Sequence, residues 1–128
     1  MIIANEMDEI EKIVSENDSL IQNAMDSNRI DSIQSISNRT VTSLSKKYFD
    51  VQNIQVPDNG KNFKMTAESY ITSLIDFVKT QNLYAAFSDT ITEQEAKIID
   101  DKNAEAIKVV ELQHKRYKEY RTAFDKIK

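Results

Sequence analysis

The chain of 128 residues has no cysteine, one histidine, one glycine and one proline. Without cysteine, disulfides, cysteine-ligated zinc and thiol catalysis are excluded. So few glycines and prolines leave few turn signals, which argues against a sheet of many short strands. The sequence also has no apolar run long enough to cross a membrane, and no apolar segment typical of a signal peptide.

The charge balance is mildly acidic, with a net charge of −4 and a pI of about 5.0. A broad nucleic-acid surface needs a basic balance, so we expect no nucleic-acid partner. Hydrophobic residues make up 40% and charged residues 30% of the chain. These values fit one small domain with a hydrophobic core and solvent-exposed polar faces. We therefore assign residues 1–128 to a single domain.

The segment from Thr92 to Lys128 contains no glycine or proline, and its pattern is typical of one continuous helix about 50 Å long. Apolar or amphipathic residues recur there in steps of four and three: Ile99, Asn103, Ala106, Val110, Gln113, Tyr117, Tyr120, Phe124 and Ile127. We expect the upstream helices to cover this stripe.

Three further helices are predicted upstream, at about Ile3–Met25, Arg29–Asn53 and Asn62–Tyr84. Turn-forming residues separate them at Asp26–Asn28 and at Ile54–Gly60. The predicted fold is therefore all-α, a four-helix up-and-down bundle with a long C-terminal helix. The last helix is longer than the other three, and its extra length protrudes, kinks near Asn103, or supports a homodimer. The sequence leaves these alternatives open.

Charge and capping add detail to this arrangement. Residues 6–31 carry a local balance of eight acidic against two basic side chains, whereas residues 108–128 carry seven basic against three acidic ones. We therefore expect the first and last helices to be antiparallel neighbours with the acidic start beside the basic end. Two capping boxes overlap before the last helix, Thr90 with Glu93 and Thr92 with Glu95, and we favour Thr92 as the cap.

No motif specifies a reaction. Glu111-Leu-Gln-His114 has Glu-x-x-His spacing, but a di-iron bundle needs a second such motif and His114 is the only histidine. His114 is therefore interpreted as a rim residue, and Asp100-Asp101 as part of a solvated face. We predict no enzyme activity, no catalytic residue, no metal ligand and no cofactor.

The basic aromatic run from Lys115 to Arg121 has a structural interpretation: its tyrosines, Tyr117 and Tyr120, lie on the core stripe, and its cations pair with the first helix. Asn103 and Gln113 are expected to form a satisfied polar pair inside the bundle.

Four residues are candidate contacts for a protein partner. Glu9 and Glu11 belong to the acidic face of the first helix, and Tyr84 and Phe87 lie near a helix end. With Phe49, the two aromatic residues are expected to form a small cluster at one end of the bundle, or an exposed patch that contacts a partner.

Several residues give the chain, from about Ile10 onward, a resemblance to a bacterial family. They are Tyr48, then Ile54-x-Val56-Pro57-Asp58, then Phe63-Lys64-x-x-Ala67-x-x-Tyr70-Ile71, and in the last helix Gln113, Tyr117 and Phe124. The pattern resembles helical surface lipoproteins described in Leptospira and found also among Bacteroidetes. The resemblance implies a processed, membrane-tethered bundle of unknown biochemical role, although no lipobox cysteine is present here.

Two functions are carried forward from the sequence. The first is a non-enzymatic binding or structural module, the soluble part of a cell-envelope or surface lipoprotein, tethered through a segment absent from this chain. Its place would be periplasmic or at the cell surface if a signal was removed, and cytoplasmic otherwise. The alternative is a cytosolic antitoxin or immunity-type protein whose acidic helical face binds a basic partner.

Overall fold

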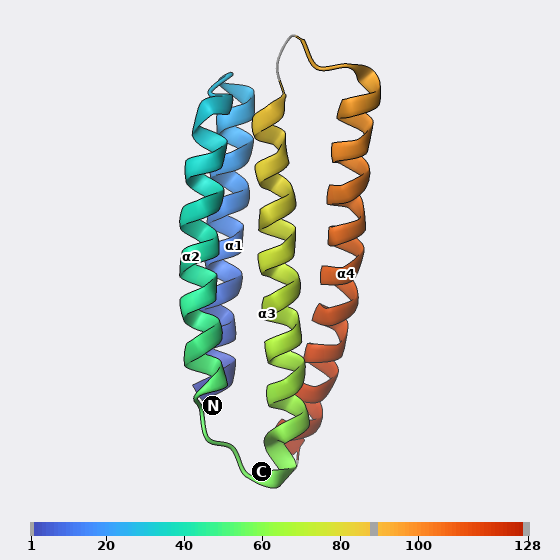
Figure 1. Ribbon diagram of the computed structural model, residues 1–128. Helices are drawn as coiled ribbons and strands as arrows, with labels where there is room; N and C mark the ends of the chain where they lie inside the picture. Colours follow the sequence, from blue (N-terminus) through green and yellow to red (C-terminus); the bar gives the residue numbers. More distant parts are fainter. Residues whose placement is uncertain (1, 88–89, 127–128) are drawn as a thin grey trace.

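The computed structural model describes residues 2–87 and 90–126, which form four helices and no strand. The helices are α1 (Ile2–Asp26), α2 (Ile33–Gln52), α3 (Lys61–Gln81) and α4 (Glu93–Lys126). They run alternately up and down, as Figure 1 shows, so the predicted all-α bundle is confirmed. Within the described ranges, no helix is long and apolar enough to span a membrane.

The turn between α1 and α2 is built on Asn28, whose φ of 56° lies in the left-handed region. The amide of Asn28 donates to the Met25 carbonyl, and the amide of Arg29 donates to the Ala24 carbonyl at 2.7 Å. This is a Schellman ending, which satisfies carbonyls that the helix itself leaves unpaired. A short 3₁₀ turn, η1 (Ile30–Ser32), then leads into α2.

The connection from α2 to α3 passes through extended Pro57 and the 3₁₀ turn η2 (Asp58–Gly60). Lys64 Nζ reaches back from α3 and donates to the carbonyls of Gln52 and Ile54, at 2.6 and 2.8 Å. Glycine suits position 60 because a Cβ there would lie 3.0 Å from the ring of Phe124. The loop and the end of α4 therefore pack directly on each other.

A third 3₁₀ turn, η3 (Asn82–Ala86), follows α3 before the chain enters α4. The amide of Glu95 donates to Thr92 Oγ1 at 3.1 Å, and the amide of Thr92 donates to Glu95 Oε1 at 3.3 Å. This reciprocal pair is a capping box. Thr92 is thus the cap, as predicted.

The core divides into two apolar clusters along the bundle. The larger fills the end nearest the N-terminus and includes Ile3, Met7, Leu44, Phe63, Ile71, Val78 and Tyr117. The smaller lies at the other end around Ile21, Ala24 and Ile33. Asn17 and Ser37, each 1% exposed, and Gln81, 8% exposed, are polar residues buried in the same bundle. Along α1, Asn17 precedes Ile21 of the smaller cluster, and along α3, Gln81 follows Val78 of the larger cluster. The polar residues therefore lie between the two clusters.

One detail of the stripe predicted for α4 is wrong. Tyr120, expected in the stripe of α4, is 38% exposed. Ile127 lies outside the described residues.

The other helices cover the stripe of α4 only in part. Among the described residues of α4, only Tyr117 is buried, whereas α3 carries buried residues along its whole length. α4 packs chiefly against α3, and its lower part passes behind α3 in Figure 1. It remains one uninterrupted helix through Asn103. The bundle is therefore organised around α3, with α4 on its outside.

Candidate functional site

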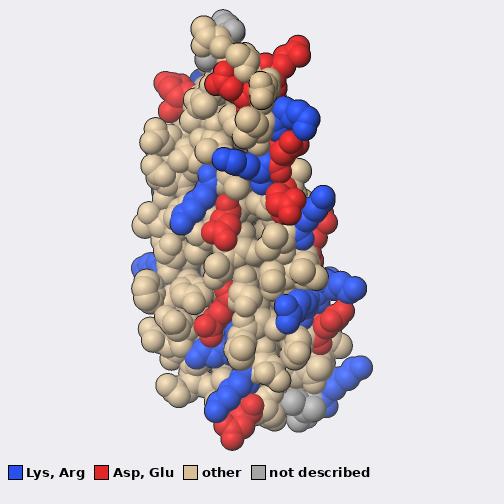
Figure 2. All heavy atoms as spheres, turned by 45° about the vertical axis from the view of Figure 1, so that its right-hand side comes forward, with Lys and Arg blue, Asp and Glu red and all other residues tan. Residues whose placement is uncertain are grey.

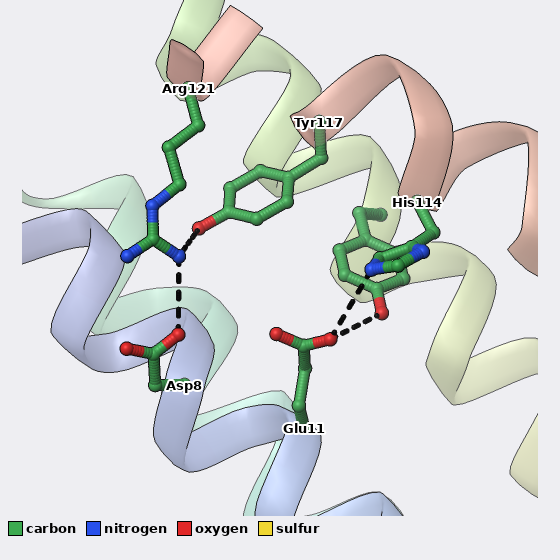
Figure 3. Close-up of polar contacts among 6 residues, drawn as sticks. Asp8, Glu11, His114, Tyr117 and Arg121 are labelled. Atoms are coloured by element: carbon green, nitrogen blue, oxygen red, sulfur yellow. Dashed lines mark hydrogen bonds and ion pairs between the residues drawn. The ribbon is translucent and has the colours of Figure 1, made fainter. Parts of the chain in front are cut away.

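The lower half of α4 is joined to α1 by polar side chains at the surface (Figure 3). Arg121 Nη1 lies 3.2 Å from Asp8 Oδ1, and the same nitrogen donates to the hydroxyl of Tyr117 at 3.4 Å. The acidic start of α1 therefore meets the basic end of α4, as the charge pattern predicted.

One turn further along, Glu11 of α1 is the centre of a second contact. Its Oε2 accepts a hydrogen bond from the hydroxyl of Tyr70 at 3.1 Å and lies 3.5 Å from His114 Nε2. The His114 ring packs against the Tyr70 ring with centroids 5.3 Å apart. His114 is thus a rim residue that bridges three helices, consistent with its predicted place.

Burial raises the pKa of the two phenols beside this contact. Burial, and then the Glu11 carboxylate, raises the pKa of Tyr70 well above its ordinary value. Burial also raises the pKa of Tyr117, to about 12, although Arg121 opposes the shift. Both phenols keep their protons at neutral pH, so Tyr70 acts as a hydrogen-bond donor and not as a base. We call the set Asp8, Glu11, Tyr70, His114, Tyr117 and Arg121 the clasp.

Stacked aromatic rings, two of them from the clasp, connect α3 and α4. Tyr117 stacks on Tyr70 at 5.5 Å and on Phe63 at 5.6 Å, and Phe124 stacks on Phe63 at 5.4 Å. Such pairs contribute about 0.5–1.5 kcal/mol beyond their buried area. The rings hold the lower half of α4 on the bundle.

Above the clasp, a groove of about 310 Å³ lies between α1 and α4, with α3 as its floor. Its apolar surface comes from five residues on three helices: Val14, Leu74, Phe77, Ile107 and Val110. Its rim carries the carboxylates of Glu11, Asp18 and Glu111, and no lysine or arginine lines it. We call this hollow the α1–α4 groove. Its composition suits a ligand that has an apolar side and a positive charge.

A second hollow of about 390 Å³ lies further up the same seam and shares Asp18 with the α1–α4 groove. Its polar wall is fixed by hydrogen bonds: Gln81 Nε2 donates to Asp18 Oδ1 at 2.9 Å, and Asn17 Nδ2 donates to Gln81 Oε1 at 2.6 Å. The adjacent position on α4 is Asn103, which accepts from Thr80 Oγ1 at 3.1 Å. Asn103 therefore pairs with α3, and the predicted pairing with Gln113 is wrong.

On its opposite flank, α4 borders a shallower hollow of about 410 Å³ over α3. Small residues of α3, Ser69, Thr72 and Ser73, form the floor, and Met65 and Val109 contribute apolar surface. Gln113 lines this hollow. α4 thus has an open hollow along both sides.

The structure places the four predicted partner contacts in three locations. Glu9 forms an ion pair with Lys47 of α2, and Glu11 belongs to the clasp, so neither is a free acidic side chain. Tyr84 donates to Asp100 Oδ1 at 2.7 Å and packs on Phe87 with ring centroids 4.9 Å apart. Of these residues, only Glu11 lines the α1–α4 groove.

A related prediction, the common aromatic cluster, needs correction. Phe49 is 61% exposed and packs on Tyr48 near the end of α2, whereas Tyr84 and Phe87 lie at the opposite end of the bundle. The three aromatic residues therefore form no common cluster. Asp100 and Asp101 lie on an exposed face as predicted, and each has a partner: Tyr84 for Asp100 and Lys97 for Asp101.

Sequence reasoning missed most of the α1–α4 groove. Ile107 and Glu111 lie off the main stripe of α4. The signal available in the sequence was Ile107 itself, an apolar residue outside the stripe. In the structure, Ile107 is 37% exposed.

The described residues contain no group of three or more acidic or histidine side chains placed to hold a metal ion. Comparisons with protein families, with characterised proteins and with solved structures found no match to this chain.

Proposed function

We propose that this protein is a non-enzymatic helical binding module that takes a basic, amphipathic segment of a partner protein in the α1–α4 groove. The observation that carries the proposal is the pairing of an apolar floor with a rim of three carboxylates and no cation among the described lining residues. An amphipathic helix docks in this way by placing its apolar side in a groove. Lysine or arginine side chains beside that apolar face would meet the carboxylates.

The three carboxylates differ in how free they are to bind. Glu11 is engaged in the clasp, and Asp18 accepts from Gln81. Glu111 is exposed and has no polar partner within the part of the chain that the structure describes. Glu111 is therefore the side chain whose reversal changes the groove with least effect on the fold.

The test uses a synthetic helical peptide with leucine on one face and lysine on the other, and a matched peptide with glutamate in place of lysine. We expect the lysine peptide to shift the methyl resonances of Val14, Leu74, Ile107 and Val110, with an affinity that falls as salt rises. Glu111→Lys should weaken binding about tenfold, the loss of one favourable charge contact. Asp76 lies on α3 and lines the hollow on the opposite flank of α4. Asp76→Lys makes the same change of charge there and should leave binding unchanged.

Absence of binding by the lysine peptide would overturn the proposal. Equal binding of both peptides, or equal loss in Glu111→Lys and Asp76→Lys, would also count against it, because the groove would then contribute no charge selectivity.

For the compartment, we propose the cell envelope, with the chain as the soluble part of a surface lipoprotein. The support is the resemblance carried by Tyr48, the Val56-Pro57-Asp58 segment and the Phe63 to Ile71 pattern. Fractionation of source cells and intact mass of the native protein test it. A lipidated cysteine upstream of Met1 in the membrane fraction would support the proposal; an N-terminus at Met1 in the soluble fraction would favour the cytosolic, antitoxin or immunity-type alternative.

A further inference from the structure

α4 carries a second stripe of residues at alternating steps of four and three, on the flank that faces away from α1. Its apolar members are Ile98, Val109, Leu112 and Ala123, and its charged members are Lys102, Glu105, Arg116 and Glu119. All eight are exposed; Ile98 is 49%, Val109 44% and Leu112 54% accessible. We call this set the outer stripe. The alternating steps of four and three place all eight residues on one flank of α4, which is the spacing used by the seam of a coiled coil.

The outer stripe is complementary to itself when a second copy runs antiparallel. With a two-fold axis midway between Val110 and Glu111, Val109 of one copy faces Leu112 of the other at the centre. The next layers outward place Glu105 opposite Arg116, and then Lys102 opposite Glu119. Ile98 faces Ala123 at each end. Every charged layer therefore joins opposite signs, and every apolar residue meets an apolar one.

The remaining observations agree with a second copy as the occupant. Across residues 2–87 and 90–126, none of Lys102, Glu105, Arg116 and Glu119 has a hydrogen-bond or ion-pair partner. Figure 2 shows acidic and basic side chains interspersed over the α4 side of the molecule, with no large area of one sign. A two-fold interface uses the same patch on both copies, so such a patch must complement itself.

We propose that two copies of this chain associate through an antiparallel pairing of α4 along the outer stripe. This pairing uses the flank of α4 opposite the α1–α4 groove, so it is independent of the proposed function. The proposed axis also places the acidic first half of each α4 beside the basic second half of the other. Parallel pairing would bring like charges together in each layer and is therefore disfavoured.

Sedimentation equilibrium of the full chain tests the assembly. We expect a concentration-dependent species of twice the 14.7 kDa chain mass. Glu105→Arg and Arg116→Glu should each weaken the dimer at least about tenfold, because each places two pairs of like charges across the seam. Mixing the two variants in equal amounts should restore association, since both pairs in the mixed dimer again have opposite signs. Glu111→Arg, on the other flank of the same helix, should leave the dimer unchanged.

The register of the two paired α4 helices is tested separately by introducing cysteines, because the chain has none of its own. Mixed Ile98→Cys and Ala123→Cys proteins should form the hetero-disulfide in preference to either homo-disulfide. A wild-type chain that stays monomeric up to about 1 mM, a threshold that corresponds to a very weak dimer, would overturn the proposal. A dimer unaffected by both charge reversals, a mixture that fails to reassociate, or preferred homo-disulfides would do so as well.

Discussion

Asn17 of α1 donates from Nδ2 to the side-chain oxygen of Gln81 on α3 at 2.6 Å, across 64 positions of sequence. The bond lies between the two apolar clusters and joins α1 to α3. Buried amides specify alignment in this way because a shifted neighbour would leave their polar atoms unpaired. Gln81 in turn donates to Asp18 at the surface, so the interior bond connects to the wall of the upper hollow.

Replacing Asn17 alone should be costly. Asn17→Leu leaves Gln81 Oε1 buried without its donor, and we expect the free energy of unfolding to fall by about 1–3 kcal/mol. Asn17→Leu combined with Gln81→Leu should cost less than the two single changes added together. Urea unfolding of the four proteins gives the coupling energy; additive effects would show that the bond does not link the helices.

The stacked aromatic rings and the ion pair between Asp8 and Arg121 should contribute unequally to stability. Tyr117→Ala removes a side chain that is 1% exposed and stacked on two rings, and should lower the free energy of unfolding by about 3–5 kcal/mol. Arg121→Gln breaks a half-exposed ion pair and should cost less than about 1 kcal/mol, with the effect vanishing at high salt. A larger loss from Arg121→Gln than from Tyr117→Ala would reverse this ranking.

Alkaline pH should destabilise the fold through its tyrosines. Burial raises the pKa of Tyr84 and of Tyr117 from the ordinary value of 10.0 to about 12 in the folded chain. Between these values the unfolded chain releases protons that the folded chain retains, so the free energy of unfolding falls as pH rises from about 10 to about 12. Below about pH 10 these two groups cause no such change.

Urea unfolding at several alkaline pH values measures this fall, and near-ultraviolet absorbance reports the phenolates directly. Tyr117→Phe should flatten the pH dependence, because phenylalanine has no proton to release. A slope that is identical in the variant would show that Tyr117 does not contribute.

The end of α1 offers a prediction about backbone conformation. Asn28→Ala should lower the free energy of unfolding by about 1 kcal/mol, because a Cβ at φ 56° is strained and alanine lacks the side chain that favours this region. Asn28→Gly should preserve or raise stability, since glycine adopts the left-handed region freely. Thermal melts of the two variants against wild type decide this; similar losses in both would mean that the asparagine side chain matters more than the backbone angle.

Local patterns were sufficient for much of the fold. The core faces of α2 and α3 follow directly from residues such as Leu44, Phe63 and Ile71, which recur at helical spacing. The Thr92–Glu95 capping box needs only four consecutive residues. The opposite charges at the start of α1 and the end of α4 were enough to predict that Asp8 and Arg121 lie on neighbouring helices.

The candidate site was less predictable. Glu11 is engaged by Tyr70, 59 positions away, and no local pattern indicates that contact. Periodicity shows which face of a helix is apolar, but it does not show how closely a neighbour covers that face. For this reason Tyr120 was assigned to the core, and Ile107 was not recognised as part of a groove.

The sequence by itself determined the four helices, the cap of the last one and their alternating direction, because spacing, caps and the charge along each helix act within a few turns of the chain. Only the tertiary structure decided that α3 is central, that α4 stands on its outside, and that hollows open along both sides of α4. Those features depend on the shapes of side chains from three helices packed together, with Tyr70 and Tyr117 holding one half of α4 close. The volumes that remain open above them are a property of that packing and of no single segment.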